Sequence, residues 1–203
     1  AWLLQNGRIP SAIASDVREG PLSRARATAR ACGCFERMSF RLCDGLSGIA
    51  PEEVDALVIA GMGGETIANI LEAAPWVKEK NFPIILQPMS TQAELRGWLW
   101  RNGFLCLREK TVLEGETLYS IILARQGGAV PMTPAEEWAG RQYPGMEDPL
   151  RGLLLDHLLG RVRRALDGMA RSRAPAEARR RELEQVLEGL MEMRKEWDAW
   201  QQR

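Results

Sequence analysis

The stretch that decides the fold is Val58-Ile-Ala-Gly61-Met62-Gly63-Gly64, in which a short apolar run leads directly into a glycine-rich turn. A helical pattern follows the turn, so the segment is typical of a strand–turn–helix unit. Glycine permits close approach of a ligand to the backbone, and helix N-termini present free N–H groups. A tight turn alone would also explain the glycines. The stretch has no GxGxxG pattern, and the absence of a Walker lysine disfavours nucleotide hydrolysis.

Similar runs on both sides of this stretch predict an α/β domain. We expect strands at residues 12–15, 38–43, 55–60, 83–87, 104–113 and 117–124. We expect helices at residues 21–32, 65–73 and 91–102. Strands that alternate with helices predict a parallel sheet covered on both faces. The last two strands are joined by a short turn at Gly115, so that pair must be antiparallel.

A second, helical region follows a segment rich in glycine and proline at residues 126–134. We therefore expect an α/β domain at 1–128 and a helical domain at 129–203. Beyond this segment apolar residues recur in steps of three and four, which is an amphipathic helix pattern. They lie at positions 150, 153, 154, 158, 162, 166, 169, 183, 186, 187, 190, 193, 197 and 200. Ala174-Pro175 interrupts the pattern, which predicts two helices in an antiparallel hairpin, a coiled coil.

Composition excludes several classes of protein. The 203 residues include 27 basic and 27 acidic residues, and no apolar run approaches the roughly 20 residues that span a bilayer. We see no leader signal and expect a cytoplasmic protein without a membrane anchor. Cysteines at 32, 34, 43 and 106 do not have zinc-site spacing, so we expect reduced cysteines and no metal. His157 is the single histidine, which weakens any Ser-His-Asp catalysis.

Polar residues follow the expected strands where a ligand would lie. Asp16 ends the first expected strand, Asp44-Gly45 ends the second and Gln87-Pro88 ends the fourth. A carboxylate at a strand's carboxyl end can accept hydrogen bonds from ribose hydroxyls, and a glutamine amide can pair with a base edge. Each residue singly is more often a loop residue or a strand terminator. Together with the glycine turn they describe a site for an adenosine-bearing cofactor.

Six segments of the chain together resemble one known family. They are AIASDVREGP (12–21), CDGL (43–46), IAGMGG (59–64), ILQP (85–88), LRGWL (95–99) and ETLYSIILA (116–124). The family is that of the bacterial TrmK S-adenosylmethionine-dependent tRNA (adenine-22-N1)-methyltransferases. The resemblance implies a Rossmann-like domain followed by a helical coiled-coil domain. It implies S-adenosylmethionine as cofactor and tRNA as partner, in a monomer or weak homodimer. It implies cofactor binding by Asp16, Val17, Asp44, Gly45, Gly61, Met62, Gly63 and Gly64, and a catalytic role for Gly61, Met62, Gly63, Gln87 and Pro88.

Two departures from the family stand out. Met89 occupies the position where the family has Asn after Gln-Pro, which bears on any contact of that position with the base. The family's first strand and acidic cofactor loop do not occur in the chain, which begins Ala1-Trp-Leu-Leu without a methionine. We expect these residues to lie upstream in the natural protein. We therefore expect either a split between the strands at 12–15 and 55–60, or a substitute strand from elsewhere.

Basic residues predict where RNA would bind. Residues 161–181 hold eight arginines, and we expect RNA contacts at Arg171, Arg173, Arg179, Arg180 and Arg181. A second basic set consists of Arg18, Arg24, Arg26, Arg30, Arg37 and Arg41. A solvated helix face explains the first set nearly as well. Three alternatives stay open: a methyltransferase with another substrate, a nicotinamide-dependent oxidoreductase, and a catalytically inactive RNA- or protein-binding scaffold.

Overall fold

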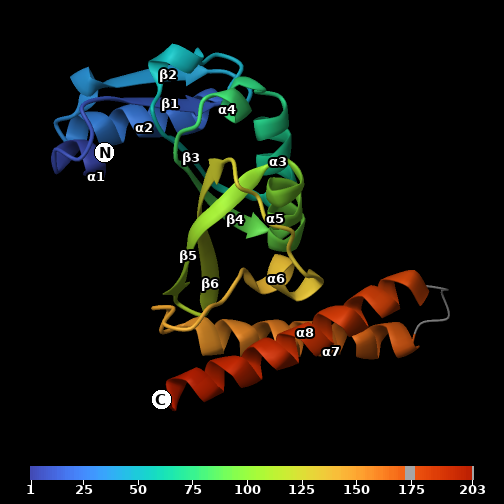
Figure 1. Cartoon of the computed structure of the whole chain (residues 1–203). Helices are drawn as coiled ribbons and strands as arrows, with labels where there is room; N and C mark the ends of the chain where they lie inside the picture. Colours follow the sequence, from blue (N-terminus) through green and yellow to red (C-terminus); the bar gives the residue numbers. More distant parts are fainter. Residues whose placement is uncertain (172–176, 203) are drawn as a thin grey trace. The chain divides into compact units, whose positions relative to one another are not determined.

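The computed structural model describes residues 1–171 and 177–202 (Figure 1). The chain divides into two compact units. The first consists of Ala1–Val54 and Asn69–Val77, and the second of Asp55–Ala68 and Lys78–Arg203. This division is one of packing, and the expected domain ranges of 1–128 and 129–203 stay a prediction.

The first unit is built around a two-stranded parallel sheet. Its strands β1 (Ala12–Asp16) and β2 (Met38–Leu42) pair in parallel, with Asp16 opposite Leu42. The other elements are α1 (Trp2–Gln5), α2 (Glu19–Ala31) and the short 3-10 helices η1 (Phe35–Arg37) and η2 (Pro51–Glu53). Leu4, Ala29 and Cys34 form a small buried cluster in this unit. The parallel pair places the residues that follow both strands at one edge.

The second unit contains a four-stranded sheet in the order β3-β4-β6-β5. Its strands are β3 (Leu57–Gly63), β4 (Ile84–Ser90), β5 (Phe104–Glu114) and β6 (Thr117–Gln126). β3 and β4 are parallel, whereas β6 runs antiparallel to both β4 and β5, as expected for the closing pair. The chain continues from β3 into α3 (Gly64–Glu72) and α4 (Trp76–Glu79), and from β4 into α5 (Gln92–Arg101). Each expected strand is present within about three residues of its expected ends.

The strands of the described residues form separate sheets in the two units. β1 pairs with β2, and β3 pairs with β4, without a ladder that joins β1 to β3. The expectation that these two strands would not pair directly is therefore confirmed for the described residues, and the split itself stays a prediction.

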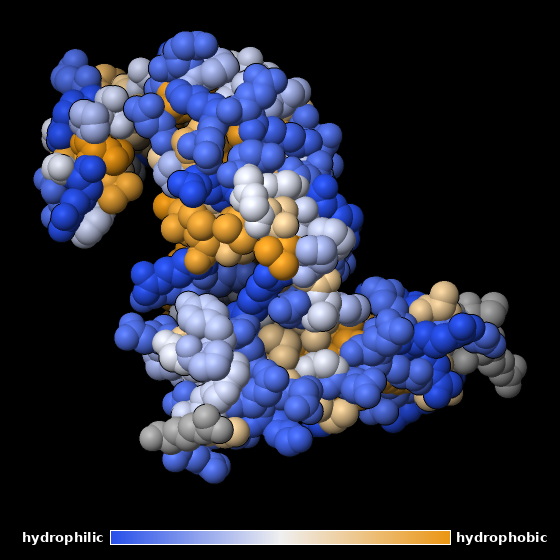
Figure 2. Space-filling view, viewed as in Figure 1, coloured by the Kyte–Doolittle hydropathy of each residue, from blue (hydrophilic) through white to orange (hydrophobic). Residues whose placement is uncertain are grey.

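One face of the four-stranded sheet is open to solvent. Leu57, Ile59 and Ile84 are buried on the other face, whereas Val58 is 58% exposed and its register partner Ile85 is 38% exposed. Figure 2 shows a hydrophobic area over this sheet. The expectation that both faces would be covered is wrong for this face. Side chains alternate along a strand, so the uncovered face presents every second residue of β3.

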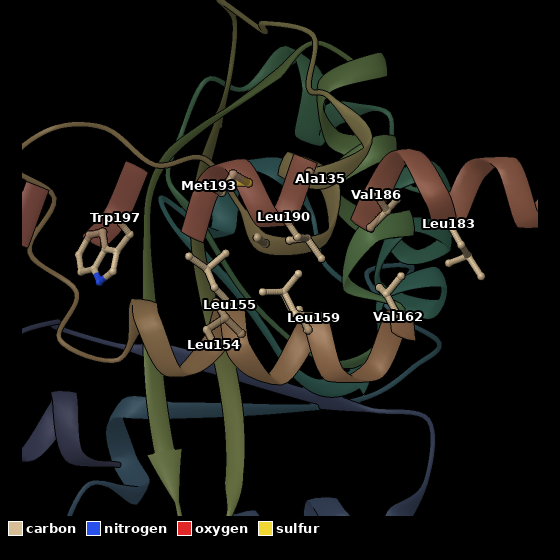
Figure 3. Close-up of a cluster of buried hydrophobic side chains, with 12 residues drawn as sticks. Ala135, Leu154, Leu155, Leu159, Val162, Leu183, Val186, Leu190, Met193 and Trp197 are labelled. Carbon is tan, nitrogen blue, oxygen red and sulfur yellow. The ribbon is translucent and has the colours of Figure 1, made fainter. Parts of the chain in front are cut away.

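The C-terminal part of the second unit is helical, as expected. It consists of α6 (Pro134–Ala139), α7 (Arg151–Arg171) and α8 (Glu177–Gln201). α7 and α8 lie side by side in opposite directions, because Arg194 of α8 contacts Asp156 near the start of α7. Figure 3 shows the buried side chains between them. The cluster includes Leu154, Leu155, Leu158, Leu159, Val162, Leu183, Val186, Leu190, Met193 and Trp197. A coiled-coil geometry in the strict sense stays a prediction.

Two buried arginines attach the helical part to the sheet. Arg96 of α5 is 1% exposed and forms a bidentate ion pair with Glu109 of β5, with N···O distances of 2.8–3.1 Å. It also donates to the carbonyl oxygens of Glu137 and Trp138, both at 2.9 Å. Arg151 donates to the carbonyl oxygens of Ala139 and Gly140. The last carbonyls of α6, which lack helical partners, are thus satisfied by guanidinium groups.

Burial lowers the pKa of Arg151 to about 10, so the guanidinium stays protonated at neutral pH. Its positive charge is therefore kept inside the structure together with that of Arg96. Asp148 and Glu109 supply the compensating negative charges, as expected where ionised groups are buried. Asp148 is itself held by the backbone N–H and the hydroxyl of Thr111 on β5, at 3.2 and 2.7 Å.

Candidate functional site

The glycine turn lies at the carboxyl end of β3 and is braced by β4. Gly61 has a φ angle of +78°, and no atom lies within 4 Å of the position that a Cβ would take there. The backbone N–H of Gly61 donates to the Oε1 atom of Gln87, at 2.9 Å. Strand β3 runs on through Met62 and Gly63, which pair with Pro88 and Ser90. The turn is therefore open on one side and fixed on the other.

A second brace joins the two strand-to-helix connections. A Cβ at Gly64 would lie 2.2 Å from the carbonyl oxygen of Thr91, so only glycine fits. The hydroxyl of Thr91 accepts a hydrogen bond from the backbone N–H of Glu65, at 3.2 Å. Thr91 has a φ angle of +49°, the left-handed region that non-glycine residues rarely adopt. This strained residue thus supports the start of α3 from the start of α5.

Hydroxyl groups surround the third residue of the turn. The Cβ position of Gly63 lies 3.2 Å from the Ser90 hydroxyl and 3.8 Å from the hydroxyls of Thr66 and Thr91. Sequence reasoning did not single out these three side chains. The signal available was the serine and threonine that follow Gln-Pro-Met, but their convergence on the turn depends on the pairing of β3 with β4.

Gln87 and Pro88, both expected to be catalytic, differ in burial. Gln87 is partly buried, and its Nε2 atom lies 3.4 Å from both the Pro88 carbonyl oxygen and the Met89 sulfur. Pro88 is buried. Met89, which replaces the family's Asn, is 50% exposed. Because the amide oxygen of Gln87 is already engaged by Gly61, the amide N–H groups are its remaining means of contacting a base.

The expected cofactor residues of the first unit meet at one edge of its sheet. The Oδ1 atom of Asp16 accepts from the backbone N–H of Arg18, at 2.8 Å, and the Asp16 carbonyl accepts from Cys43, at 3.1 Å. Asp44 is exposed, and Val17 is 62% exposed. Gly45 has a φ angle of +53° and packs against Ile70. The structure thus brings Asp16, Val17, Asp44 and Gly45 together in one unit.

The second unit holds the other expected residues, which are Gly61 to Gly64 with Gln87 and Pro88. One set of expected site residues therefore belongs to the first unit and the other set to the second unit.

Each set, taken within its own unit, offers groups that S-adenosylmethionine could contact. The Arg18 N–H bonds to the Oδ1 atom of Asp16, and the Oδ2 atom is the second acceptor of that carboxylate. Asp44 lies at the surface. Both carboxylates can therefore accept hydrogen bonds from hydroxyl or amino groups of a ligand. The open Cβ position at Gly61 leaves room for backbone approach. The exposed apolar side chain of Val17 offers a surface for a flat ring. These residues therefore fit the group that the sequence predicts.

The arginines expected to bind RNA are exposed but partly neutralised. Arg179, Arg180 and Arg181 each pair with a glutamate one turn away on α8, at 2.7, 2.9 and 3.6 Å. Exposed pairs of this kind are weak, so a phosphate can compete for the guanidinium. Arg171 ends α7 and is also exposed. Arg173 lies outside the described residues.

Three of the six arginines of the second basic set have contacts within the first unit. Arg26 pairs with Glu19 and lies over the Phe40 ring. Arg30 lies over the Phe35 ring, and Arg41 pairs with Glu53 at 3.0 Å. These arginines hold the surface of the unit together.

Neither a metal-binding cluster in residues 1–171 and 177–202 nor a reactive thiol at Cys106 is supported. Within these ranges no three His, Cys, Asp or Glu side chains gather as a metal site. Burial, reinforced by the charge of Glu109, raises the pKa of the Cys106 thiol to about 12. Cys106 is therefore protonated and a poor nucleophile at neutral pH. Among the same residues, no helix is long and apolar enough to cross a membrane.

Comparison with known proteins finds similarity to methyltransferases. A protein-family model described as a methyltransferase domain matches residues 1–122. The tRNA (adenine(22)-N(1))-methyltransferase of Bacillus subtilis (strain 168) is 34% identical over 126 residues, which are 62% of this chain and 53% of that protein. The chain thus spans about half the length of this curated relative.

Solved structures resemble the chain over most of its length. A Streptococcus pneumoniae protein described as a candidate tRNA (m1A22) methyltransferase is 27% identical, with a TM-score of 0.80. The match covers 95% of this chain and 86% of that one. The same protein in complex with S-adenosyl-L-methionine matches with a TM-score of 0.79 at 27% identity, over 95% and 85% of the two chains. These matches confirm the Rossmann-like fold and the resemblance noted from the sequence.

Proposed function

Because this chain belongs to the family of methyltransferase domains, we propose that it transfers the methyl group of S-adenosylmethionine to N1 of an adenine, at position 22 of tRNA. The observation that carries this proposal is the open glycine turn at Gly61, braced by Gln87 of the adjacent parallel strand. Ligands of such folds bind at the carboxyl ends of the strands. The name of the Bacillus subtilis relative supports the choice of reaction and substrate.

The cofactor supplies an electrophilic methyl group on a positively charged sulfur. In our proposal Asp16 and Asp44 accept hydrogen bonds from its ribose and adenine, and Val17 packs against the adenine ring. Gly45 lets the chain turn sharply after Asp44, because its φ angle is positive. Gly61, Met62, Gly63 and Gly64 line the methionine side. These residues bind and orient the cofactor, and none of them needs to transfer a proton.

The reaction demands alignment more than a strong base. Adenine N1 carries a lone pair and is itself the nucleophile, so a chain with one histidine can catalyse the transfer. Holding the two reactants in line supplies most of the acceleration in such a case. Gln87 and Pro88 lie in the middle of β4, which runs on to Ser90 and not only to Gln87 as expected, and there they would hold the base beside Gly61 and Met62. The brace from Gln87 to Gly61 keeps this edge in one geometry.

We propose that the arginines at the end of the hairpin contact the tRNA phosphates. Neutralising Arg171, Arg173, Arg179, Arg180 and Arg181 together should lower tRNA affinity and flatten its salt dependence, because fewer counterions are released. Binding of S-adenosylmethionine should not change in this variant. An unchanged salt slope would show that these arginines form only a solvated face.

The direct test is calorimetric titration of the protein with S-adenosylmethionine and, separately, with a nicotinamide dinucleotide. We expect binding of the first alone. Binding of the dinucleotide alone would overturn the proposal in favour of an oxidoreductase, and binding of neither would favour a scaffold. Transfer of labelled methyl to tRNA, compared with transfer to free adenosine and to protein substrates, then tests the substrate. We further propose that the enzyme acts in the cytoplasm as a monomer or weak homodimer.

A further inference from the structure

A small cleft with a volume of about 70 Å³ lies in the second unit between the start of α5 and the helical hairpin. Its walls include Thr91 and Gln92 of the α5 start, Trp138 of α6, Leu158 and Arg161 of α7, and Arg179 of α8. This volume is well below that of a pocket for a drug-sized ligand, so the cleft can accept only a small group. None of the residues assigned above to cofactor or base lines it. Arg179 alone belongs also to the arginines proposed to contact tRNA.

Two arginines and one aromatic side chain are among the residues that line the cleft. Arg161 lies over the Trp138 ring, with its Cζ atom 5.3 Å from the ring centroid. This cation–π contact holds the guanidinium in place while its N–H groups stay available. Arg179 pairs with Glu182 at 2.7 Å, but both side chains are 50% exposed, so the pair is weak and exchangeable. Glu94 is the one acidic residue among those described in the lining.

The cleft continues from the proposed reaction edge through a shared residue. Thr91 lines the cleft, and its hydroxyl and carbonyl also support the backbone at Glu65 and Gly64. Ser90, the preceding residue, lies beside Gly63. A chain of nucleotides with one base at the glycine turn would therefore reach the cleft with its neighbouring backbone.

We propose that this cleft binds a phosphate of the RNA strand next to the target adenine, with Arg161 and Arg179 as its two cationic contacts. The proposal rests on the proposed function and names a particular subsite for its substrate. Arginine's planar fork matches the geometry of phosphate oxygens, and two such groups in a concave site favour a phosphate over a peptide carboxylate. The Trp138 ring keeps Arg161 positioned before the RNA arrives, which lowers the cost of binding.

The test compares two double variants that remove the same charge from the helical hairpin. R161Q/R179Q removes both cleft arginines, and R180Q/R181Q removes two exposed arginines outside the cleft lining. Affinity is measured with an unmodified tRNA transcript at fixed salt. We expect R161Q/R179Q to weaken binding about tenfold more than R180Q/R181Q, because it loses charge-assisted hydrogen bonds to a fixed phosphate. Equal losses in the two variants would overturn the cleft site and leave a diffuse basic patch.

A second readout reports on the cleft itself. The protein is labelled with 5-fluorotryptophan, and the ¹⁹F resonance of Trp138 is assigned by its loss in W138F. Saturating tRNA should shift this resonance in the wild type and in R180Q/R181Q, and leave it unshifted in R161Q/R179Q. An unshifted Trp138 resonance in wild type that binds tRNA overturns the cleft site alone. Wild type that fails to bind tRNA at all overturns the proposed function as well.

Discussion

The side-chain oxygen of Gln87 accepts a hydrogen bond from the backbone N–H of Gly61, at 2.9 Å. This bond ties the middle of β4 to the glycine turn at the end of β3, two segments that lie 26 residues apart in the sequence. A turn left without this bond would sample several backbone conformations, since glycine is the most permissive residue. The bond therefore links the residue expected to face the base with the residues expected to face the cofactor.

Replacing this acceptor should damage catalysis more than stability. In Gln87→Ala we expect methyl transfer to fall by about tenfold, equivalent to about 1.4 kcal/mol of transition-state stabilisation. The thermal midpoint should change little, since an exposed hydrogen bond contributes about 1 kcal/mol or less. Gln87→Glu keeps the acceptor oxygen and should retain more activity. Equal activity of Gln87→Ala and wild type would show that the brace is irrelevant to the reaction.

The close approach of Thr91 to Gly64 makes a prediction about stability. In Gly64→Ala the new methyl group would lie 2.2 Å from the Thr91 carbonyl, so the backbone must shift. We expect a loss of about 1–3 kcal/mol in the free energy of unfolding. The matched control is Gly168→Ala in α7, where the Cβ meets no atom within 4 Å. That change should stabilise by about 0.5–1 kcal/mol, and denaturant unfolding of both variants gives the comparison.

Asp44 tests the assignment of the cofactor edge. We expect Asp44→Ala, made in the full-length protein, to weaken S-adenosylmethionine binding by about 1–3 kcal/mol, the size of a lost charge-assisted hydrogen bond. Because the side chain is exposed at the end of β2, the stability of the fold should not change. Calorimetry measures the affinity. An unchanged dissociation constant would remove Asp44 from the site.

The buried ion pair of Arg96 with Glu109 should be essential to the second unit. Arg96→Met leaves the Glu109 carboxylate and two α6 carbonyls without their donor, and we expect a loss of about 3–5 kcal/mol in unfolding free energy. Arg101→Gln provides the control on the same helix. It breaks the pair of Arg101 with Glu137, in which Arg101 is 54% exposed, and should cost about 0–1 kcal/mol. Similar losses in the two variants would contradict the structural role given to Arg96.

The sequence predicted the helices and strands whose signals lie within a few adjacent residues. Hydrophobic runs of strand length and the glycines after Val58 located β3 and its turn, because both signals lie within a few adjacent residues. The spacing of apolar residues likewise located α7 and α8. The helix at Pro134–Ala139 was missed, although Thr133 and Glu136 form a capping box at its start. The glycine- and proline-rich segment expected at 126–134 ends where this helix begins, and we expected no helix immediately after it.

Contacts between distant segments could not be derived from the sequence. Arg96 and Glu109 are 13 residues apart on different elements, and Arg96 reaches the carbonyls of α6 some 41 residues further on. Such pairs depend on how β5, α5 and α6 pack. The same holds for the convergence of Thr91 with Gly64, and for Arg161 over Trp138. Arg96 and Arg161 carry the same side chain, and burial alone separates the structural arginine from the exposed one.

The most direct measurement maps the methyl group on the product. An unmodified tRNA transcript with adenine at position 22 is incubated with the protein and S-adenosylmethionine, and the modified base is identified by mass spectrometry of nuclease fragments. The account predicts N1-methyladenine at position 22, and no methylation of a transcript with guanine at that position. Methylation elsewhere in both transcripts, or no methylation in a protein that binds both ligands, would contradict the proposed function.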